Sequence, residues 1–121
     1  QPPTMGDVLK YELNPNYTRE TVTLLAGTTY PVGAVLGRIT ASSKMKLSTA
    51  TGTDGAQNAA AVLLYDVDAT AADATSIVVV RGPAIVSKAA LVFDASVDDA
   101  AKTAAKHAQL AALGIITRDT A

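Results

Sequence analysis

The sequence contains no cysteine and no tryptophan, and it has one histidine, four Tyr and one Phe. The absence of cysteine excludes disulfides, thiolate nucleophiles and cysteine-based zinc sites. The shortage of aromatic rings disfavours a carbohydrate-binding module, because such modules stack rings on sugars. His107 is the one imidazole available as a base or metal ligand, and no motif of a known active site surrounds it. The sequence therefore predicts neither an enzyme nor a histidine-based metal site.

Charge and hydrophobic runs are also limited. Ten basic and eleven acidic residues give a formal net charge of −1, without a run of Lys or Arg, so neither DNA nor RNA is an expected partner. No apolar run reaches the length of a membrane span. Asp66 and Asp68 have the spacing that begins a calcium loop, but Ala71 and Ile77 stand where an EF-hand needs Gly and Glu. We therefore expect no metal, no cofactor and no membrane partner.

The residues that are present favour a mainly β fold with one C-terminal helix, in the α+β class. Threonine and valine are abundant, and both favour strands. Strands are predicted over residues 17–25, 34–40, 44–48, 59–67, 76–82, 84–93 and 115–118, with the second and third forming a hairpin. The runs at 59–67 and 76–82 are continuously apolar, which is typical of central strands.

The helix is predicted to begin with Ser96 as its N-cap and to end at Gly114. On a helical wheel, one arc consists of small apolar residues, which predicts close packing of this arc on the domain. These residues are Val97, Ala100, Ala101, Ala104, Ala105, Ala108, Ala111 and Ala112. Leu110 and Leu113 fall on the opposite, polar arc, and we interpret them as contacts to a neighbouring segment or a partner subunit.

Residues 1–16 are predicted to form an extended N-terminal arm ahead of a domain at 17–121. Prolines interrupt the segment, yet it carries apolar side chains, which is typical of a chain that adds as a strand to a partner's sheet. The alternative is an arm that folds back over its own domain or remains free. Residues 1–4 are interpreted as a possible remnant of a tag or leader.

Five blocks in order resemble the head decoration proteins of tailed bacteriophages, the phage lambda decoration protein among them. The blocks are "YTRETVTLLAG", "PVGAVLGRIT", "TDGAQNAAAVLLYDVDATAAD", "VVVRGPAIV" and "LAALGIITR". The resemblance implies a β-clip fold, a bent ribbon or partial barrel. It also implies a homotrimer that binds the major capsid protein at local three-fold positions of the expanded head, on the outer surface of the virion, after synthesis in the host cytoplasm. In that role the protein cements the shell against the pressure of the packaged genome.

Two sets of contact residues follow as predictions. The capsid-binding arm is assigned to Val8, Leu9, Tyr11 and Leu13, and the trimer interface to Ile77, Val79, Leu110 and Leu113. A free arm further predicts that deletion of residues 5–16 leaves a folded domain that no longer binds capsids. The competing interpretations are a generic β-rich binding or surface-display module, and a small enzyme in which His107 or the acids of 66–73 gather in a pocket.

Overall fold

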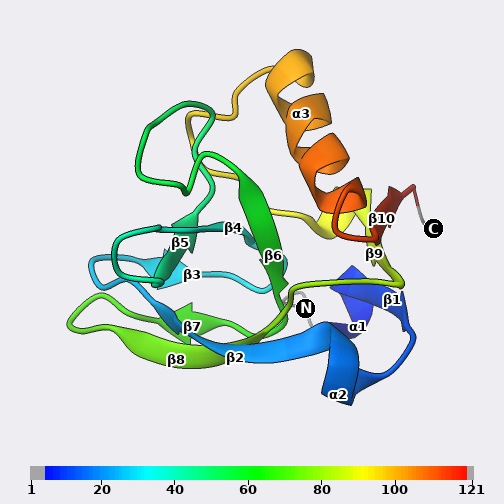
Figure 1. Ribbon diagram of the computed structural model, residues 1–121, viewed down its shortest axis with the longest axis horizontal. Coiled ribbons are helices and arrows are strands. Elements are labelled where there is room, and N and C mark those ends of the chain that lie inside the picture. Colours follow the sequence, from blue (N-terminus) through cyan, green and yellow to red (C-terminus); the bar gives the residue numbers. More distant parts are fainter. Residues whose placement is uncertain (1–4, 120–121) are drawn as a thin grey trace.

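A computed structural model describes residues 5–119 (Figure 1). The fold is mainly β, as predicted, and its one long helix lies near the C-terminus. The elements, in chain order, are α1 (Met5–Val8), β1 (Leu9–Glu12), α2 (Pro15–Thr18), β2 (Arg19–Leu24), β3 (Thr29–Tyr30), β4 (Val35–Arg38), β5 (Met45–Leu47), β6 (Ala59–Leu63), β7 (Val67–Asp68), β8 (Ala74–Val79), β9 (Ala84–Ser87), the 3-10 turn η1 (Lys88–Ala90), α3 (Ala100–Ala111) and β10 (Ile115–Arg118).

Five strands close into a barrel in the order β2-β5-β4-β6-β8. The predicted hairpin is confirmed, because β4 and β5 pair antiparallel with Leu36 opposite Leu47. The apolar runs at β6 and β8 are confirmed as strands with a neighbour on each side: β6 pairs with β4 and β8, and β8 pairs with β6 and β2. Val62 lies opposite Val79 in the β6–β8 pair. The long β2–β8 ladder completes the barrel wall. The observed ring agrees with the partial barrel expected from the sequence.

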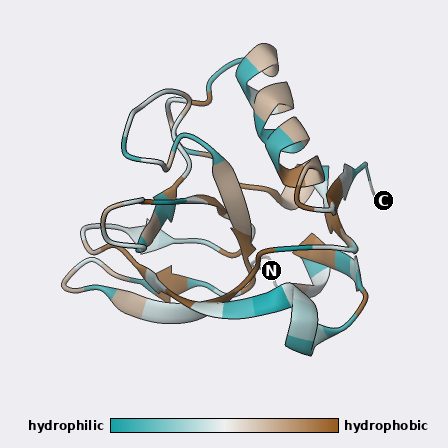
Figure 2. Cartoon of the chain, in the orientation of Figure 1, coloured by the Kyte–Doolittle hydropathy of each residue, from teal (hydrophilic) through white to brown (hydrophobic). Residues whose placement is uncertain are grey.

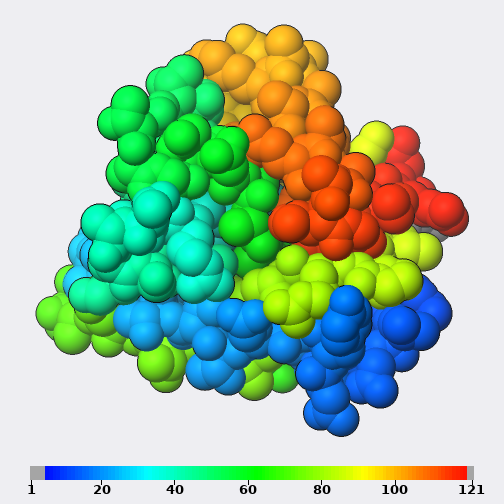
Figure 3. Space-filling model, viewed as in Figure 1, coloured from blue at the N-terminus to red at the C-terminus, as the bar shows by residue number. Residues whose placement is uncertain are grey.

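A second sheet of three strands lies beside the barrel in the order β1-β9-β10, and β3 pairs with β7 in a small ribbon. β9 is central: β1 runs antiparallel to it and β10 runs parallel to it. The sheet thus joins an N-terminal strand to a C-terminal strand. In Figure 3 the N-terminal segment (blue) and the C-terminal residues (red) lie on the same side of the molecule.

The core is aliphatic and divides into two clusters. The larger cluster lies between the barrel, the three-stranded sheet and α3, and it includes Val8, Val35, Val79, Leu110 and Ile115. The other fills the barrel around Tyr30, whose hydroxyl donates to the Leu25 carbonyl oxygen at 2.7 Å. Figure 2 shows the hydrophobic residues in the strands, whereas the loop between β5 and β6 is mainly white and teal. Small side chains let backbones approach closely: a Cβ on Gly37 would collide with the backbone of Ala56.

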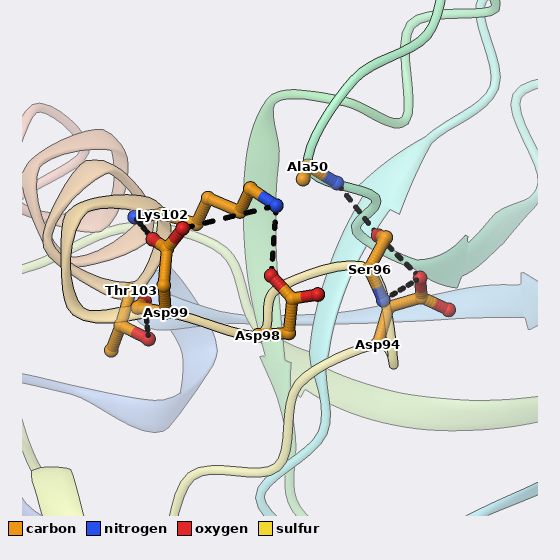
Figure 4. A network of polar contacts seen from close by, with 7 residues as sticks. All are labelled: Ala50, Asp94, Ser96, Asp98, Asp99, Lys102 and Thr103. Atoms are coloured by element: carbon orange, nitrogen blue, oxygen red, sulfur yellow. Dashed lines mark hydrogen bonds and ion pairs between the residues drawn. The ribbon is translucent and has the colours of Figure 1, made fainter.

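The start of α3 differs from the prediction. Asp99, not Ser96, is the N-cap, and its carboxylate accepts a hydrogen bond from the Lys102 amide at 2.8 Å. Ser96 belongs to the preceding turn, where its hydroxyl donates to Asp94 at 2.6 Å and accepts from the Ala50 amide at 2.9 Å (Figure 4). Because Ser96 is held by these partners, the helix begins after it.

The helix also presents the opposite face from the one predicted. Lys106 and Leu110 are 2% and 0% exposed, respectively, and they face the domain. The alanine arc faces solvent, with Ala100, Ala101, Ala104, Ala105, Ala108, Ala111 and Ala112 all exposed. The wheel failed because it counts Lys106 as a surface residue, whereas acceptors on the neighbouring loop surround its ammonium group.

The N-terminal segment is packed on the domain rather than extended away from it. Val8 is fully buried, and β1 is hydrogen-bonded to β9, with Tyr11 opposite Ile85. Asn14 caps α2 through its side chain, which accepts from the Asn16 amide at 2.9 Å. Of the two alternatives left open by the sequence, the structure has the segment folded back over its own domain. Residues 1–4, interpreted as a possible remnant, lie outside the described residues.

Candidate functional site

The large hydrophobic side chains that remain exposed mark the candidate surface. They are Tyr11 (50%), Leu13 (58%), Tyr17 (54%), Tyr65 (44%), Leu113 (36%) and Ile116 (40%). Tyr11 and Ile116 belong to the edge strands of the β1-β9-β10 sheet, while Leu13 and Leu113 adjoin it. The Leu13 amide donates to the Pro83 carbonyl, and the Gly82 amide donates to the Leu113 carbonyl, so both leucines flank the turn that precedes β9. Four of the six exposed side chains therefore gather around one sheet.

The register of the β1-β9-β10 sheet places one side chain from each of its three strands in a row. Tyr11 and Ile116 each pair with Ile85 of the central strand, one from either side. Directly paired residues project from the same face of a sheet. The opposite face carries Ala84, Val86 and Ile115, which are buried in the core. We call the exposed side the outer sheet face, defined by Tyr11, Leu13, Ile85, Ile116 and Arg118.

Two of the four residues predicted to contact the capsid lie on this face. Tyr11 and Leu13 are exposed, whereas Val8 is fully buried and Leu9 is partly buried against the core. Val8 and Leu9 therefore hold the segment on the domain, because their side chains are used within the subunit. Sequence analysis missed Ile85 and Ile116, since β9 and β10 were read as strands without any indication of which face the solvent reaches. The adjacent Ile115 and Ile116 give no alternation in the sequence, so no local signal indicates which of the two is exposed.

The four residues predicted to form the trimer interface differ in exposure: two are buried in the subunit, one is partly buried and one is exposed. Val79 and Leu110 are both 0% exposed and lie in the core of the subunit, so their assignment to a subunit interface is wrong for this structure. The reason is tertiary: β8 is an inner barrel strand, and Leu110 fills the space between α3 and β6. Ile77 is partly buried against the same cluster, and Leu113 is exposed. These two remain predictions.

A polar contact fixes the base of the outer sheet face. Glu12, at the end of β1, accepts hydrogen bonds from Thr18 at 2.6 Å and from Arg19 at 2.5 Å. Burial raises the pKa of Glu12, but the hydrogen bonds from Arg19 and Thr18 and the Arg19 charge outweigh it and hold the pKa below its usual value. The ionised carboxylate therefore ties β1 to the start of β2 and holds Tyr11 and Leu13 in place.

The residues considered for catalysis do not come together. Asp66 and Asp68 line an open hollow of about 440 Å³ with Thr29, Tyr30, Pro31 and Val67, and His107 is not among its lining residues. Asp66 instead accepts from the Val32 amide at 2.9 Å, and Asp68 accepts from the Thr70 hydroxyl at 2.7 Å, as turn-forming carboxylates do. His107 packs against the Phe93 ring at 5.9 Å. Within residues 5–119, no group of three or more metal-ligating side chains is close enough to hold an ion.

Comparison with known proteins decides between the remaining classes. The sequence model of one protein family, described as bacteriophage lambda head decoration protein D, matches residues 1–115. The chain belongs to this family. No curated protein matches the sequence. Head decoration proteins are structural, non-catalytic proteins of the virion that sit on the capsid surface. None of the helices in the described part of the chain is both long and apolar enough to cross a membrane.

Membership of the head decoration family implies that this protein binds the capsid. The match takes in the N-terminal segment, the barrel and α3 and ends at Ile115, so it covers nearly the whole described fold. The prediction that the protein is not an enzyme is confirmed by this membership.

Proposed function

We propose that this decoration protein binds as a homotrimer to the expanded phage head at local three-fold positions, and that it stabilises the head against the pressure of the packaged genome. The family match over residues 1–115 carries the proposal. The trimer, the three-fold positions and the β-clip description are implications of the resemblance. The exposed side chains of Tyr11 and Leu13 supply a contact for the major capsid protein, and Ile77 and Leu113 supply candidates for the trimer contact.

The stabilising effect follows from binding linkage. A protein that binds only the assembled, expanded lattice adds its binding free energy to that state, and disassembly must then release it. Three copies in one trimer bind the shell at several points, so each modest contact contributes to a much stronger combined attachment.

Sedimentation with purified capsid shells tests the proposal. The protein is mixed with expanded and unexpanded empty shells, and the pellet is quantified over a range of protein concentrations. We expect saturable pelleting with expanded shells only, together with a higher temperature of shell disassembly once the sites are filled. Sedimentation equilibrium of the free protein measures whether the trimer forms before binding. A protein that stays in the supernatant with both kinds of shell would contradict the proposed function.

A further inference from the structure

The loop between β5 and β6 contains the one aspartate in the chain that is followed by glycine, Asp54–Gly55, and no asparagine is followed by glycine. Glycine has no side chain to shield its backbone nitrogen. That nitrogen is therefore free to attack the carboxyl group of the preceding aspartate and to close a five-membered succinimide ring. Asp54 is exposed, so solvent reaches the reacting groups. Asp54–Gly55 is thus the position at which the backbone of this chain is chemically easiest to modify.

The fold requires both members of this reactive pair. Gly55 has a φ of +101°, and a Cβ at this position would lie 2.7 Å from the backbone carbonyl oxygen of Arg38. The Asp54 carboxylate closes the turn, because its Oδ1 accepts a hydrogen bond from the Ala56 amide at 3.1 Å. Replacement of either residue would disturb the loop, so the reactive pair persists for a structural reason.

Two side chains hold the reacting groups of the pair. The Lys46 ammonium group lies 2.6 Å from Oδ2 of Asp54. The hydrogen bonds from Lys46 and from the Ala56 amide, together with the Lys46 charge, hold the pKa of Asp54 below its usual value. An ionised carboxylate resists attack, because only the neutral carboxyl group has a hydroxyl to lose. The Gly55 amide donates to Oε1 of Gln57 at 2.8 Å, and this bond holds the proton that the attacking nitrogen must release.

We propose that Asp54–Gly55 is a site of succinimide formation, and that its contacts with Lys46 and Gln57 keep it unreacted in the folded protein. In the reaction, the Gly55 nitrogen bonds to Cγ of Asp54 and loses its proton, and the carboxyl group loses its hydroxyl, so that one water leaves. A second water opens the ring at either carbonyl. One opening restores aspartate, and the other leaves isoaspartate, whose backbone passes through the side-chain methylene group. The proposal is independent of capsid binding.

Isoaspartate at this position would loosen the attachment of α3. The Ala56 carbonyl accepts from the Ser48 hydroxyl at 2.7 Å. The Gln57 carbonyl accepts from the Lys106 ammonium group at 2.5 Å. Both acceptors follow residue 54 directly in the chain, so an additional methylene group in the backbone there moves them relative to their donors. The modified protein should therefore melt at a lower temperature than the unmodified one.

The test measures isoaspartate at residue 54 while the full-length protein is stored at neutral pH. Peptide mass spectrometry, with fragmentation that distinguishes isoaspartate from aspartate, follows the folded protein and the same protein unfolded in guanidinium chloride. Lys46→Met and Gln57→Met each remove one protecting contact, whereas Lys46→Arg keeps the positive charge. Circular dichroism establishes that each variant is folded at the storage temperature.

A second aspartate supplies the matched control. Asp73 also has a lysine and a backbone amide as partners, Lys44 at 2.5 Å and Ala26 at 2.8 Å, but alanine follows it in the chain. Lys44→Met removes an ion pair of the same kind away from the Asp–Gly pair. It should leave both Asp54 and Asp73 unmodified.

We expect isoaspartate at residue 54 to form several-fold faster in the unfolded chain than in the folded protein, with a succinimide lighter by one water as the intermediate. Folded Lys46→Met and Gln57→Met should each react faster than the unchanged protein, and Lys46→Arg should react as slowly as it does. If Lys46→Met does not fold, Gln57→Met alone decides the result. The inference is wrong if the unchanged protein reacts equally fast folded and unfolded, or if the folded methionine variants react as slowly as the unchanged protein. Equal acceleration by Lys44→Met would also overturn it, since general loosening and not the two contacts would then control the reaction.

Discussion

Substitution of Lys106 by methionine should destabilise the protein strongly, although Lys106 lies on a surface helix. The Lys106 ammonium group donates to the Ser48 hydroxyl at 2.9 Å, the Thr49 carbonyl at 2.6 Å and the Gln57 carbonyl at 2.5 Å. The side chain is 2% exposed. Burial lowers the pKa of Lys106, and the negative charge of Asp94 opposes this effect. Lys106 thus joins the loop between β5 and β6 to α3 through its three donors.

The magnitude follows from the acceptors that lose their donor. Methionine has a similar length but no donor, so the carbonyls of Thr49 and Gln57 would be left without Lys106 in a partly buried place. Ser48 is affected less, because its hydroxyl also bonds to the Ala56 carbonyl at 2.7 Å. Each unsatisfied buried acceptor costs about 1–3 kcal/mol, and removal of the desolvated ammonium group returns part of that cost. We expect a net loss of about 2–4 kcal/mol, a large share of a stability that is typically about 5–15 kcal/mol.

Urea unfolding of Lys106→Met, followed by circular dichroism, measures this loss, and thermal melting should show a fall in Tm of roughly 8–16 °C. Lys102→Met is the control on the same helix: its ammonium group bonds to Asp98 at 2.8 Å at the surface, and such an exposed pair contributes little to stability. Hydrogen exchange should show faster opening of the 48–59 loop in Lys106→Met alone. Equal stability of the two variants would refute the reasoning, since it would mean that the buried donor contributes no more than an exposed one.

Three further outcomes are expected. Burial and the charge of Lys88 lower the pKa of His107, with the charge of Asp119 opposing, so the folded state disfavours the imidazolium. Urea unfolding should therefore show the free energy of unfolding falling as the pH drops from 7.5 through about 6.5 to 5.5. A His107→Gln variant that keeps the same pH slope would show that another group is responsible. Gly37→Ala should cost about 1–3 kcal/mol or more in thermal melting, because its Cβ collides with the Ala56 backbone, which cannot rotate away; an unchanged Tm would disprove that close approach. Deletion of residues 5–16 should reduce the free energy of unfolding by more than about 3 kcal/mol, because it removes buried Val8 and the Glu12–Arg19 pair. Thermal melting measures this loss, and a deletion variant with the original Tm would restore the interpretation of a free arm.

The strands were largely predictable because their signal is local. The clean alternation of Lys44, Met45, Lys46 and Leu47 predicted the third strand of the barrel wall, and the apolar run at 59–67 predicted the inner strand β6. Boundaries were less predictable: "AIVSKAALVF" was read as one extended piece, but it divides into β9 and η1. Such a change of conformation depends on what each residue packs against.

The candidate site was predictable only in part. Tyr11 and Leu13 could be selected because an apolar residue in a segment broken by prolines suggests a contact, and both are exposed. Leu110 was selected because it falls on the polar arc of the helix, and Val79 because it belongs to a continuously apolar run, yet both are in the core. Hydrophobicity indicates that a side chain will be covered, but it does not indicate whether the cover comes from the same chain or from a partner.

By itself, the sequence determined the class of the protein: β-rich, without a motif of a known active site or metal site, and a member of the head decoration family. Composition and the order of motifs along the chain carry that information, and neither depends on how the chain is folded. The tertiary structure alone decided which faces are exposed. The alanine arc of α3 faces solvent because Lys106 finds three acceptors on a loop 49 to 58 residues away in the chain, and the outer sheet face exists because β9 pairs with a strand from each end of the chain. Contacts between residues so distant in the sequence leave no periodic pattern in it, so burial at these positions is a property of the folded chain.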